Sequence, residues 1–202
     1  RTFMPKWGNI NERRNQLHEV IRLSGMNLII DDTDHPLIIK VASVPGEKIQ
    51  VYFIDNEEYF KRKSVYTDVR GQLFNDNDER AIFFAKGVLE TVKKLNWKPD
   101  VVHILGWMSG LVPAYLKEYY AEDSFFNGAK VVVSLYDSPF EGQLNSEIGN
   151  KLAFDGINGE VAKFLKNPDY EAMVKSALRY ADAAVKGEEF LPESINKYLE
   201  SK

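Results

Sequence analysis

The sequence predicts a single α/β domain with a mostly parallel sheet and an additional β-meander. Three observations support this fold class. Residues 1–56 are rich in short β-type segments, residues 57–202 alternate between helix and strand patterns, and no linker rich in proline, glycine or serine divides the 202 residues. Alternating strand and helix patterns are typical of parallel sheets. We therefore expect one domain, 1–202, with a β-rich part over about 1–56 and an alternating part over about 57–202.

In the β-rich part, short apolar runs with many β-branched and aromatic residues predict the strands. The run Asp31 to Pro36 is dense in turn-forming residues, and Pro45-Gly46 marks a second turn. The simplest arrangement is a meander. The expected strands cover residues 2–4, 19–23, 27–30, 37–41 and 49–54.

In the alternating part, the clearest helix runs from about 78 to 96. Its apolar residues recur at steps of three and four, and Asp76 or Asn77 is placed to cap its first turn. Pro99-Asp100 ends this pattern. The elements expected next are a strand at 101–105, a helix at 111–121, a strand at 130–136, a helix at about 169–182, a strand at 183–185 and a helix near 195–199. Apolar strands without alternation suggest that both faces of the sheet are covered.

Composition excludes several classes of protein. The chain has 26 basic and 30 acidic residues, a net charge of −4, so we expect no nucleic-acid partner. It has no cysteine, which excludes disulfides, thiol nucleophiles and thiolate metal sites. The apolar runs are far shorter than the ~20 residues that span a bilayer. We expect no membrane partner and a cytoplasmic location.

In an open parallel sheet, ligands bind beyond the carboxyl ends of the strands. The segments that follow the predicted strands are 55–56, 106–109, 137–142 and 186–187. No glycine-rich phosphate loop, no HExxH and no GxSxG motif occurs. No metal site is expected, because histidine and carboxylate residues do not recur at metal-ligand spacing.

Several candidate residues allow two interpretations. His103 is either a packed, hydrogen-bonded core ring, which we favour, or a ring nitrogen presented near a strand end. The aromatic residues Tyr59-Phe60 with Tyr66 form either core, again favoured, or a sugar-stacking surface. The stretch 76–80 either caps a helix or belongs to a site, and Asp137 is either an acid–base group or a turn residue before Pro139.

Three segments, in order, carry a resemblance to a known family. They are Val51 to Asn56 with Tyr59-Phe60-Lys61-Arg62 and Tyr66; Asp76-Asn77 with Arg80; and Lys98 to His103 continuing to Trp107, Gly110-Leu111 and Pro113. Phe3-Met4-Pro5 and Tyr180-Ala181-Asp182 are weaker matches. Together they resemble the N-terminal (starch synthase catalytic) domain of bacterial glycogen and starch synthases.

This resemblance implies a Rossmann-like three-layer domain that is one half of a GT-B glycosyltransferase. Such enzymes transfer glucose, with retention, from ADP-glucose or UDP-glucose to an α-1,4-glucan, and they need neither metal nor cofactor beyond the nucleotide-sugar donor. The resemblance places Asp76, Asn77 and Arg80 near the acceptor. It assigns His103 and Trp107 to a strand-end motif, and Asp137 to an active-site strand end. These six residues are the predicted substrate-binding residues.

The departures from the family pattern are equally informative. Gly106 stands where the family has a carboxylate, Leu105 and Met108 replace histidines, and Tyr136 and Asp137 replace a histidine and an asparagine. Losing one preorganised polar group costs about 10²–10³-fold in rate. No catalytic residue is therefore assigned. The family's first strand and its KxGGL loop are expected before Arg1, and its second domain after about residue 202, so we expect the chain as given to be catalytically incomplete.

Three functional hypotheses follow. The first is a glycogen or starch synthase domain completed by parts supplied elsewhere. The second is a non-catalytic glucan-binding or regulatory module derived from a synthase. The third is an interaction module whose open face pairs with itself or with a partner synthase. The expected partners are an α-glucan or oligosaccharide and a second protein copy or partner synthase.

Overall fold

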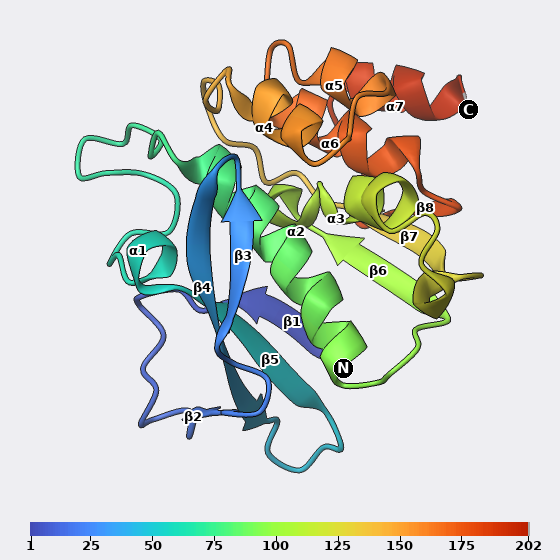
Figure 1. Ribbon diagram of the computed structural model, residues 1–202. Coiled ribbons are helices and arrows are strands. Elements are labelled where there is room, and N and C mark those ends of the chain that lie inside the picture. Colours follow the sequence, from blue (N-terminus) through green and yellow to red (C-terminus); the bar gives the residue numbers. More distant parts are fainter. Residues whose placement is uncertain (202) are drawn as a thin grey trace. The chain divides into compact units, whose positions relative to one another are not determined.

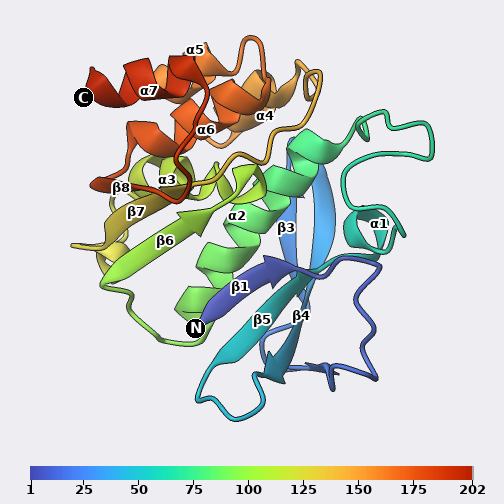
Figure 2. The ribbon, with the colours of Figure 1, turned by 180° about the vertical axis from the view of Figure 1, so that it is seen from behind.

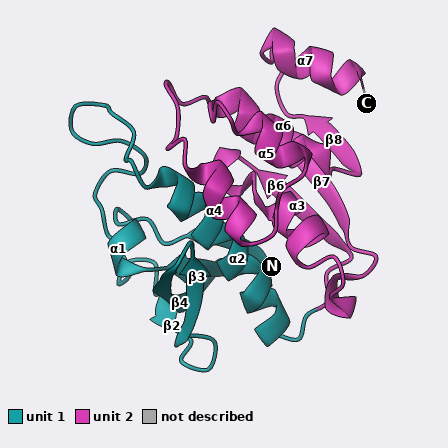
Figure 3. Cartoon of the chain, turned by 45° about the horizontal axis from the view of Figure 1, so that its top comes forward, with its two compact units in different colours: residues 1–97 teal, residues 98–202 magenta. Residues whose placement is uncertain are grey.

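The computed structural model describes residues 1–201 and divides into two compact units, with the boundary between Trp97 and Lys98 (Figure 3). The change in sequence texture near residue 56 does not coincide with this boundary, because the long helix that follows it packs with the preceding strands. The arrangement of both units as a single domain stays a prediction.

Unit 1 contains a mixed five-stranded sheet (Figure 1), in which the three consecutive antiparallel strands between Met26 and Asp55 form the expected meander and the first two strands pair outside it. The strands are β1 (Thr2–Pro5), β2 (His18–Glu19), β3 (Met26–Ile30), β4 (Thr33–Ser43) and β5 (Gln50–Asp55). Their order is β1-β5-β4-β2, with β3 also paired to β4; β1 is parallel to β5 and the other pairs are antiparallel.

Two predicted boundaries in this sheet are wrong. The strand expected at 19–23 is only the two-residue β2, and turns follow it. The turn expected at 31–36 is reduced to two residues, because β4 already begins at Thr33 and pairs with β3 over five residue pairs. Asp31 adopts a φ of 57°, which lets so short a connection reverse the chain. Ladder pairing therefore overrides the turn propensity of His35 and Pro36.

Helix α2 (Asn77–Lys94) lies along this sheet, close to its predicted range (Figures 1 and 2). At Gly87 a Cβ atom would approach Ile54 Cγ2 to 2.8 Å, so the glycine permits close packing of helix on sheet. The sequence does not predict the short helix α1 (Glu57–Phe60). Asn56 is its N-cap residue, and the Asn56 side chain accepts a hydrogen bond from the Tyr59 amide. The fully buried apolar residues include Leu37, Ile39, Ile54, Phe60 and Phe83.

Unit 2 contains a parallel three-stranded sheet, as the strand patterns predict. The strands β6 (Val101–Leu105), β7 (Lys130–Leu135) and β8 (Ala183–Lys186) lie in that order. The helix expected at 111–121 is α3 (Val112–Ala114) continuing into a π-helical segment, Tyr115–Tyr119. The other helices are α4 (Ile148–Phe154), α5 (Glu160–Phe164), α6 (Tyr170–Arg179) and α7 (Glu193–Glu200), with 3-10 turns at Trp107–Ser109 and Ser124–Phe126.

The two faces of this sheet differ in burial. One face is buried through Ile104, Val131 and Val133. On the other, Val101 and Leu105 of β6 are each 54% exposed and Val185 of β8 is 49% exposed. The expectation that these strands are covered on both faces is therefore wrong within the described residues. An unbroken run of apolar residues indicates that a strand favours burial. It does not indicate which segment covers each face of the sheet.

No helix within residues 1–201 has both the length and the apolar composition needed to cross a membrane. The 18-residue α2 illustrates the point, because Asp78 and Glu79 lie in its first turn and Lys93 and Lys94 in its last. These charges match the helix dipole.

Candidate functional site

A small cavity lies in unit 2, at the carboxyl ends of the parallel strands. Ile104, Val133 and Leu135 contribute from the sheet, Trp107 from the 3-10 turn after β6, and Tyr170 and Met173 from α6. Gly106 and Tyr136, the first residues after β6 and β7, also line it. Its free volume is about 20 Å³, enough for one or two water molecules. The cavity is therefore too small to enclose a sugar ring.

Gly106 turns the chain at the edge of this cavity. Its φ of 76° and ψ of 157° fall in a region that only glycine adopts readily. A Cβ atom at this position would meet nothing within 4 Å, so the constraint is the backbone and not the available space. The carboxylate that the family resemblance expects here is incompatible with this strand end without a change in backbone conformation.

The two strand-end motif residues occupy different environments. Trp107 is 4% exposed, and its ring centroid lies 4.8 Å from that of Phe140, so it forms a wall of the cavity. His103 is exposed, and its Nε2 lies 2.7 Å from Ser134 Oγ. The favoured interpretation of His103 as a core ring is therefore wrong with respect to burial, although the expected hydrogen bond is present. The reason is that His103 lies on the same face of the β6-β7-β8 sheet as Val101 and Leu105, which are about half exposed.

Tyr136 and Asp137 begin the loop that follows β7. The Tyr136 side chain is 44% exposed, and its carbonyl oxygen accepts a 2.8 Å hydrogen bond from the Tyr170 hydroxyl. Burial raises the pKa of that Tyr170 hydroxyl, which favours its protonated, donating form. Asp137 is exposed. Tyr136 thus lines the cavity, and the residue that follows it carries an exposed carboxylate.

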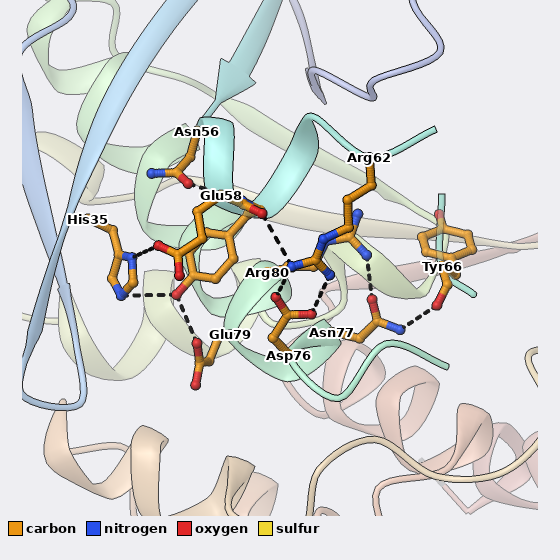
Figure 4. Close-up of polar contacts among 10 residues, drawn as sticks. His35, Asn56, Glu58, Arg62, Tyr66, Asp76, Asn77, Glu79 and Arg80 are labelled. Atoms are coloured by element: carbon orange, nitrogen blue, oxygen red, sulfur yellow. Dashed lines mark hydrogen bonds and ion pairs between the residues drawn. The ribbon is translucent and has the colours of Figure 1, made fainter. Parts of the chain in front are cut away.

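A second predicted group, in unit 1, lies at the start of α2 (Figure 4). Arg62 Nη1 donates to Asp76 Oδ1 at 2.7 Å, and its Nη2 also contacts the Asp76 carboxylate. This hydrogen bonding raises the pKa of Arg62. Asp76 precedes α2, but its side chain makes no capping bond to the helix. The predicted capping role of Asp76 is wrong, because Arg62 takes the carboxylate.

Arg80 is a fully buried cation. Its Nη1 donates to Asn77 Oδ1, while Asn77 Nδ2 donates to the Tyr66 carbonyl at 2.8 Å. Within residues 1–201, Arg80 Nε and Nη2 have no hydrogen-bond partner. Three ring centroids lie 5.2–5.5 Å from the guanidinium carbon, those of Trp7, Phe60 and Phe74. Burial lowers the pKa of Arg80 to about 10.

These contacts describe what the predicted acceptor-side residues do in unit 1. Asn77 and Arg80 are both 0% exposed, and their polar atoms connect the first turn of α2 to the segment that carries Tyr66. They support the shape of this segment, and contact with a ligand stays a prediction for them. Only Asp76 of the three is partly exposed.

A further polar cluster in unit 1 was not predicted from the sequence. The Tyr59 hydroxyl donates to Glu79 Oε2 at 2.9 Å and lies 3.0 Å from His35 Nε2, and His35 Nδ1 lies 3.5 Å from Glu58 Oε2 (Figure 4). Burial, followed by the charge of Glu79, raises the pKa of Tyr59. With Tyr59 and Phe60 at most 1% exposed, these rings are core, as favoured. The spacing of His35 and Glu79 in the sequence gives no sign of this contact.

The lining of the cavity is mostly aliphatic and aromatic, with Ser134 and two glycines among the lining residues. Among residues 1–201 no three histidine or carboxylate residues are grouped so that they could hold a metal ion. The fold and this strand-end cavity define an α/β domain of the kind that binds ligands at the carboxyl edge of a parallel sheet.

Comparison with known proteins identifies the family. The family described as starch synthase catalytic domain matches residues 1–189. The chain belongs to this family. The catalytic domain of starch synthase IV from Arabidopsis thaliana, solved with ADP and acarbose, superposes with a TM-score of 0.68 at 17% identity, covering 90% of this chain and 36% of that one. This likeness confirms the mixed α/β fold with parallel strands.

Curated relatives share more sequence with the chain. The glycogen synthase of Chlorobium limicola is 44% identical over 153 residues, which is 75% of this chain and 31% of that protein. The glycogen synthase of Pelodictyon phaeoclathratiforme is 35% identical over 205 residues, 98% of this chain and 41% of that protein. The chain thus spans about a third to two fifths of the length of these relatives.

The Asn77–Arg80 contact yields a prediction about stability. Asn77→Ala removes one of two hydrogen bonds to the Tyr66 carbonyl, which still accepts from the Phe74 amide, and removes the hydrogen bond to the buried Arg80 guanidinium. We therefore expect the free energy of unfolding to fall by about 2–4 kcal/mol. Arg80→Met removes a buried charge whose Nε and Nη2 have no hydrogen-bond partner among residues 1–201. We therefore expect Arg80→Met to lower the free energy of unfolding by less than Asn77→Ala does. Urea denaturation of both variants measures the difference, and the reverse order would contradict this view of Arg80.

The backbone of Gly106 yields a second prediction. Gly106→Ala should lower the free energy of unfolding by about 1–3 kcal/mol, because alanine is strained at this φ and ψ. Gly149→Ala is the matched control: Gly149 lies in α4, has no positive φ, and has open space at its Cβ position. It should raise stability by about 0.4–1 kcal/mol. Equal behaviour of the two variants would show that Gly106 does not need its special conformation.

Proposed function

We propose that this chain is a glycogen or starch synthase-like glycosyltransferase domain. The reaction of the complete protein would be glucosyl transfer from ADP-glucose or UDP-glucose to an α-1,4-glucan, and the chain as given would be catalytically incomplete. The observation that carries the proposal is that Trp107 and Gly110, which belong to the segment resembling the family's strand-end motif, line a cavity at the carboxyl edge of the parallel sheet.

The residues that follow β6 and β7 support the proposal that the chain is catalytically incomplete. Transfer with retention needs groups that stabilise positive charge developing on the sugar, and these must be placed before the reaction. Gly106 has no side chain, Met108 is 4% exposed and apolar, and Tyr136 offers an aromatic ring. The alternative function is therefore a non-catalytic glucan-binding or regulatory module, because binding requires an aromatic surface and hydroxyl-bonding groups but no charge-stabilising groups.

The proposed function also implies particular ligands, partners and a location in the cell. The expected ligand is an α-glucan or oligosaccharide, with the nucleotide sugar as a substrate rather than a cofactor. We place the protein in the cytoplasm, where glucan stores and nucleotide sugars would meet, and we expect neither nucleic acid nor membrane as a partner. The weakly acidic net charge of −4 supports the exclusion of nucleic acid.

Two assays on the same preparations distinguish the main proposal from its alternative. Labelled ADP-glucose and UDP-glucose are supplied at saturation with glycogen, using both the 202-residue chain and the longest natural gene product that contains it. In parallel, affinity electrophoresis in glycogen measures binding. We expect the chain alone to be retarded by glycogen and to incorporate little or no label, with incorporation confined to the longer product.

Each outcome of these assays decides something. Retardation without incorporation by either preparation favours the glucan-binding module. Incorporation by the longer product supports the synthase domain. Unretarded migration of both preparations, with no incorporation, contradicts both glucan functions. A gel without glycogen is the control for migration set by charge and size.

A second candidate function rests on the open face of the β6-β7-β8 sheet. Val101, Leu105 and Val185 lie on one face by their strand register, and each is about half exposed. Exposed apolar groups that are close together often mark interfaces. We propose that this face pairs with a second copy of the chain, or with a partner synthase that presents the same surface.

Light scattering across a range of protein concentrations tests self-association through this face. We expect the measured mass to rise with concentration, and Leu105→Asp to abolish the rise, because a charge would have to be desolvated at the interface. Ile21→Asp is the control, since Ile21 is 75% exposed but lies in unit 1. A monomer at every concentration, or equal effects of both variants, would contradict the proposal.

A further inference from the structure

Tyr136 is an exposed aromatic residue whose position is nevertheless constrained. It follows directly after β7, and its side chain is 44% exposed. One side of its ring lies against Gly187, where a Cβ atom would come within 2.4 Å of Cε1, 2.5 Å of Cζ and 2.8 Å of Cδ1. The backbone of Gly187 has no positive φ. The space taken by the Tyr136 ring therefore explains why this position is a glycine.

The main chain around this ring is also held. Gly187 N donates to the Leu135 carbonyl at 2.8 Å, which extends the pairing of β8 with β7 by one residue. The Tyr136 carbonyl accepts from the Tyr170 hydroxyl at 2.8 Å and from the Ser138 amide at 3.0 Å. A ring that is fixed by its backbone and by one neighbouring wall loses little conformational freedom when a ligand binds to its open side.

The surroundings of the open side suit a neutral, hydroxyl-bearing ligand. Tyr136 lines the strand-end cavity together with Gly106, where no side chain fills the space. Asp137, the next residue in the chain, is exposed, and its carboxylate can accept hydrogen bonds from hydroxyl groups. An apolar ring surface with an adjacent acceptor matches a pyranose, which has an apolar face and a rim of hydroxyls.

We propose that Tyr136 is a stacking platform for a glucose unit of an α-1,4-glucan, and that Gly187 is its positioning residue. This inference rests on the proposed glucan-binding function and deepens it. Tyr136 stands at the position where the family pattern has a histidine. The replacement exchanges an imidazole, which can hydrogen-bond a sugar hydroxyl, for a ring that can pack against the apolar face of a sugar. The strand end would then retain affinity for glucan while giving up charge stabilisation.

The test uses the 202-residue chain and two measurements, retardation in glycogen gels and titration with maltoheptaose followed by NMR. Tyr136→Ala should weaken binding roughly three- to tenfold, the loss expected for one aromatic contact. Tyr136→Phe keeps the ring and should stay within about twofold of the parent. Tyr119→Ala is the matched control, because Tyr119 is 45% exposed in the same unit but does not line the cavity.

Gly187 is tested through a double-mutant cycle. Gly187→Ala should weaken binding in the parent, because the added methyl group displaces the ring. In the Tyr136→Ala background it should have no further effect on affinity, since the ring it positions is gone. A purely structural role of Gly187 would weaken binding equally in both backgrounds. Far-ultraviolet circular dichroism and melting temperature verify that each variant is folded.

The outcomes separate this inference from the function on which it rests. If the parent binds glucan and Tyr136→Ala binds equally well, the platform is wrong and the glucan-binding function stands. If Tyr119→Ala weakens binding as much as Tyr136→Ala, the effect is not specific and the platform is wrong. If the parent binds no glucan, both are overturned. Titration with ADP in place of maltoheptaose should show no dependence on Tyr136, and a dependence would assign the ring to a nucleobase instead.

Discussion

The parallel pairing of β6, β7 and β8 is the constraint on which the candidate site depends. Because parallel strands end at one edge of a sheet, the residues that follow them meet there although they are far apart in sequence. Pairing of Leu105 with Ser134 and of Leu135 with Lys186 sets Gly106, Tyr136 and Gly187 at the same edge. The contact of the Tyr136 ring with Gly187 follows from this register, and a slip by one residue would turn the ring to the opposite face.

Unit 1 shows a different use of polar residues that match the family pattern. Arg80 is charged, fully buried and bonded to Asn77, and most of its surroundings are aromatic. Such a group costs stability unless its neighbours replace the water it loses. The rings of Trp7, Phe60 and Phe74 provide part of this replacement through cation–π contacts. Asn77 and Arg80 therefore stabilise the conformation at the start of α2. This structural role accounts for the same residues that the family resemblance assigns to substrate binding.

The site in unit 2 combines inherited architecture with altered chemistry. The chain belongs to the starch synthase catalytic domain family, and its cavity lies at the sheet edge expected for such a fold. At that edge stand Gly106, Met108 and Tyr136, where the family resemblance leads us to expect a carboxylate and two histidines. Aromatic and apolar groups can hold a sugar but supply little stabilisation to a developing charge. The proposed glucan-binding alternative depends on this difference.

The sequence alone determined the strand at 101–105, the strand β7 to within one residue, the range of α2 to within two residues, and the family, because these depend on local periodicity and on contiguous motifs. It also favoured Tyr59 and Phe60 as core. Only the tertiary structure decided that His103 is exposed, that Asp76 pairs with Arg62 instead of capping α2, that β4 begins at Thr33, and that Gly187 makes room for Tyr136. These features depend on which distant segment lies opposite each residue. Local propensity carries no information about that partner, since the partner is chosen by strand register and by the competition between neighbouring groups for the same polar atoms.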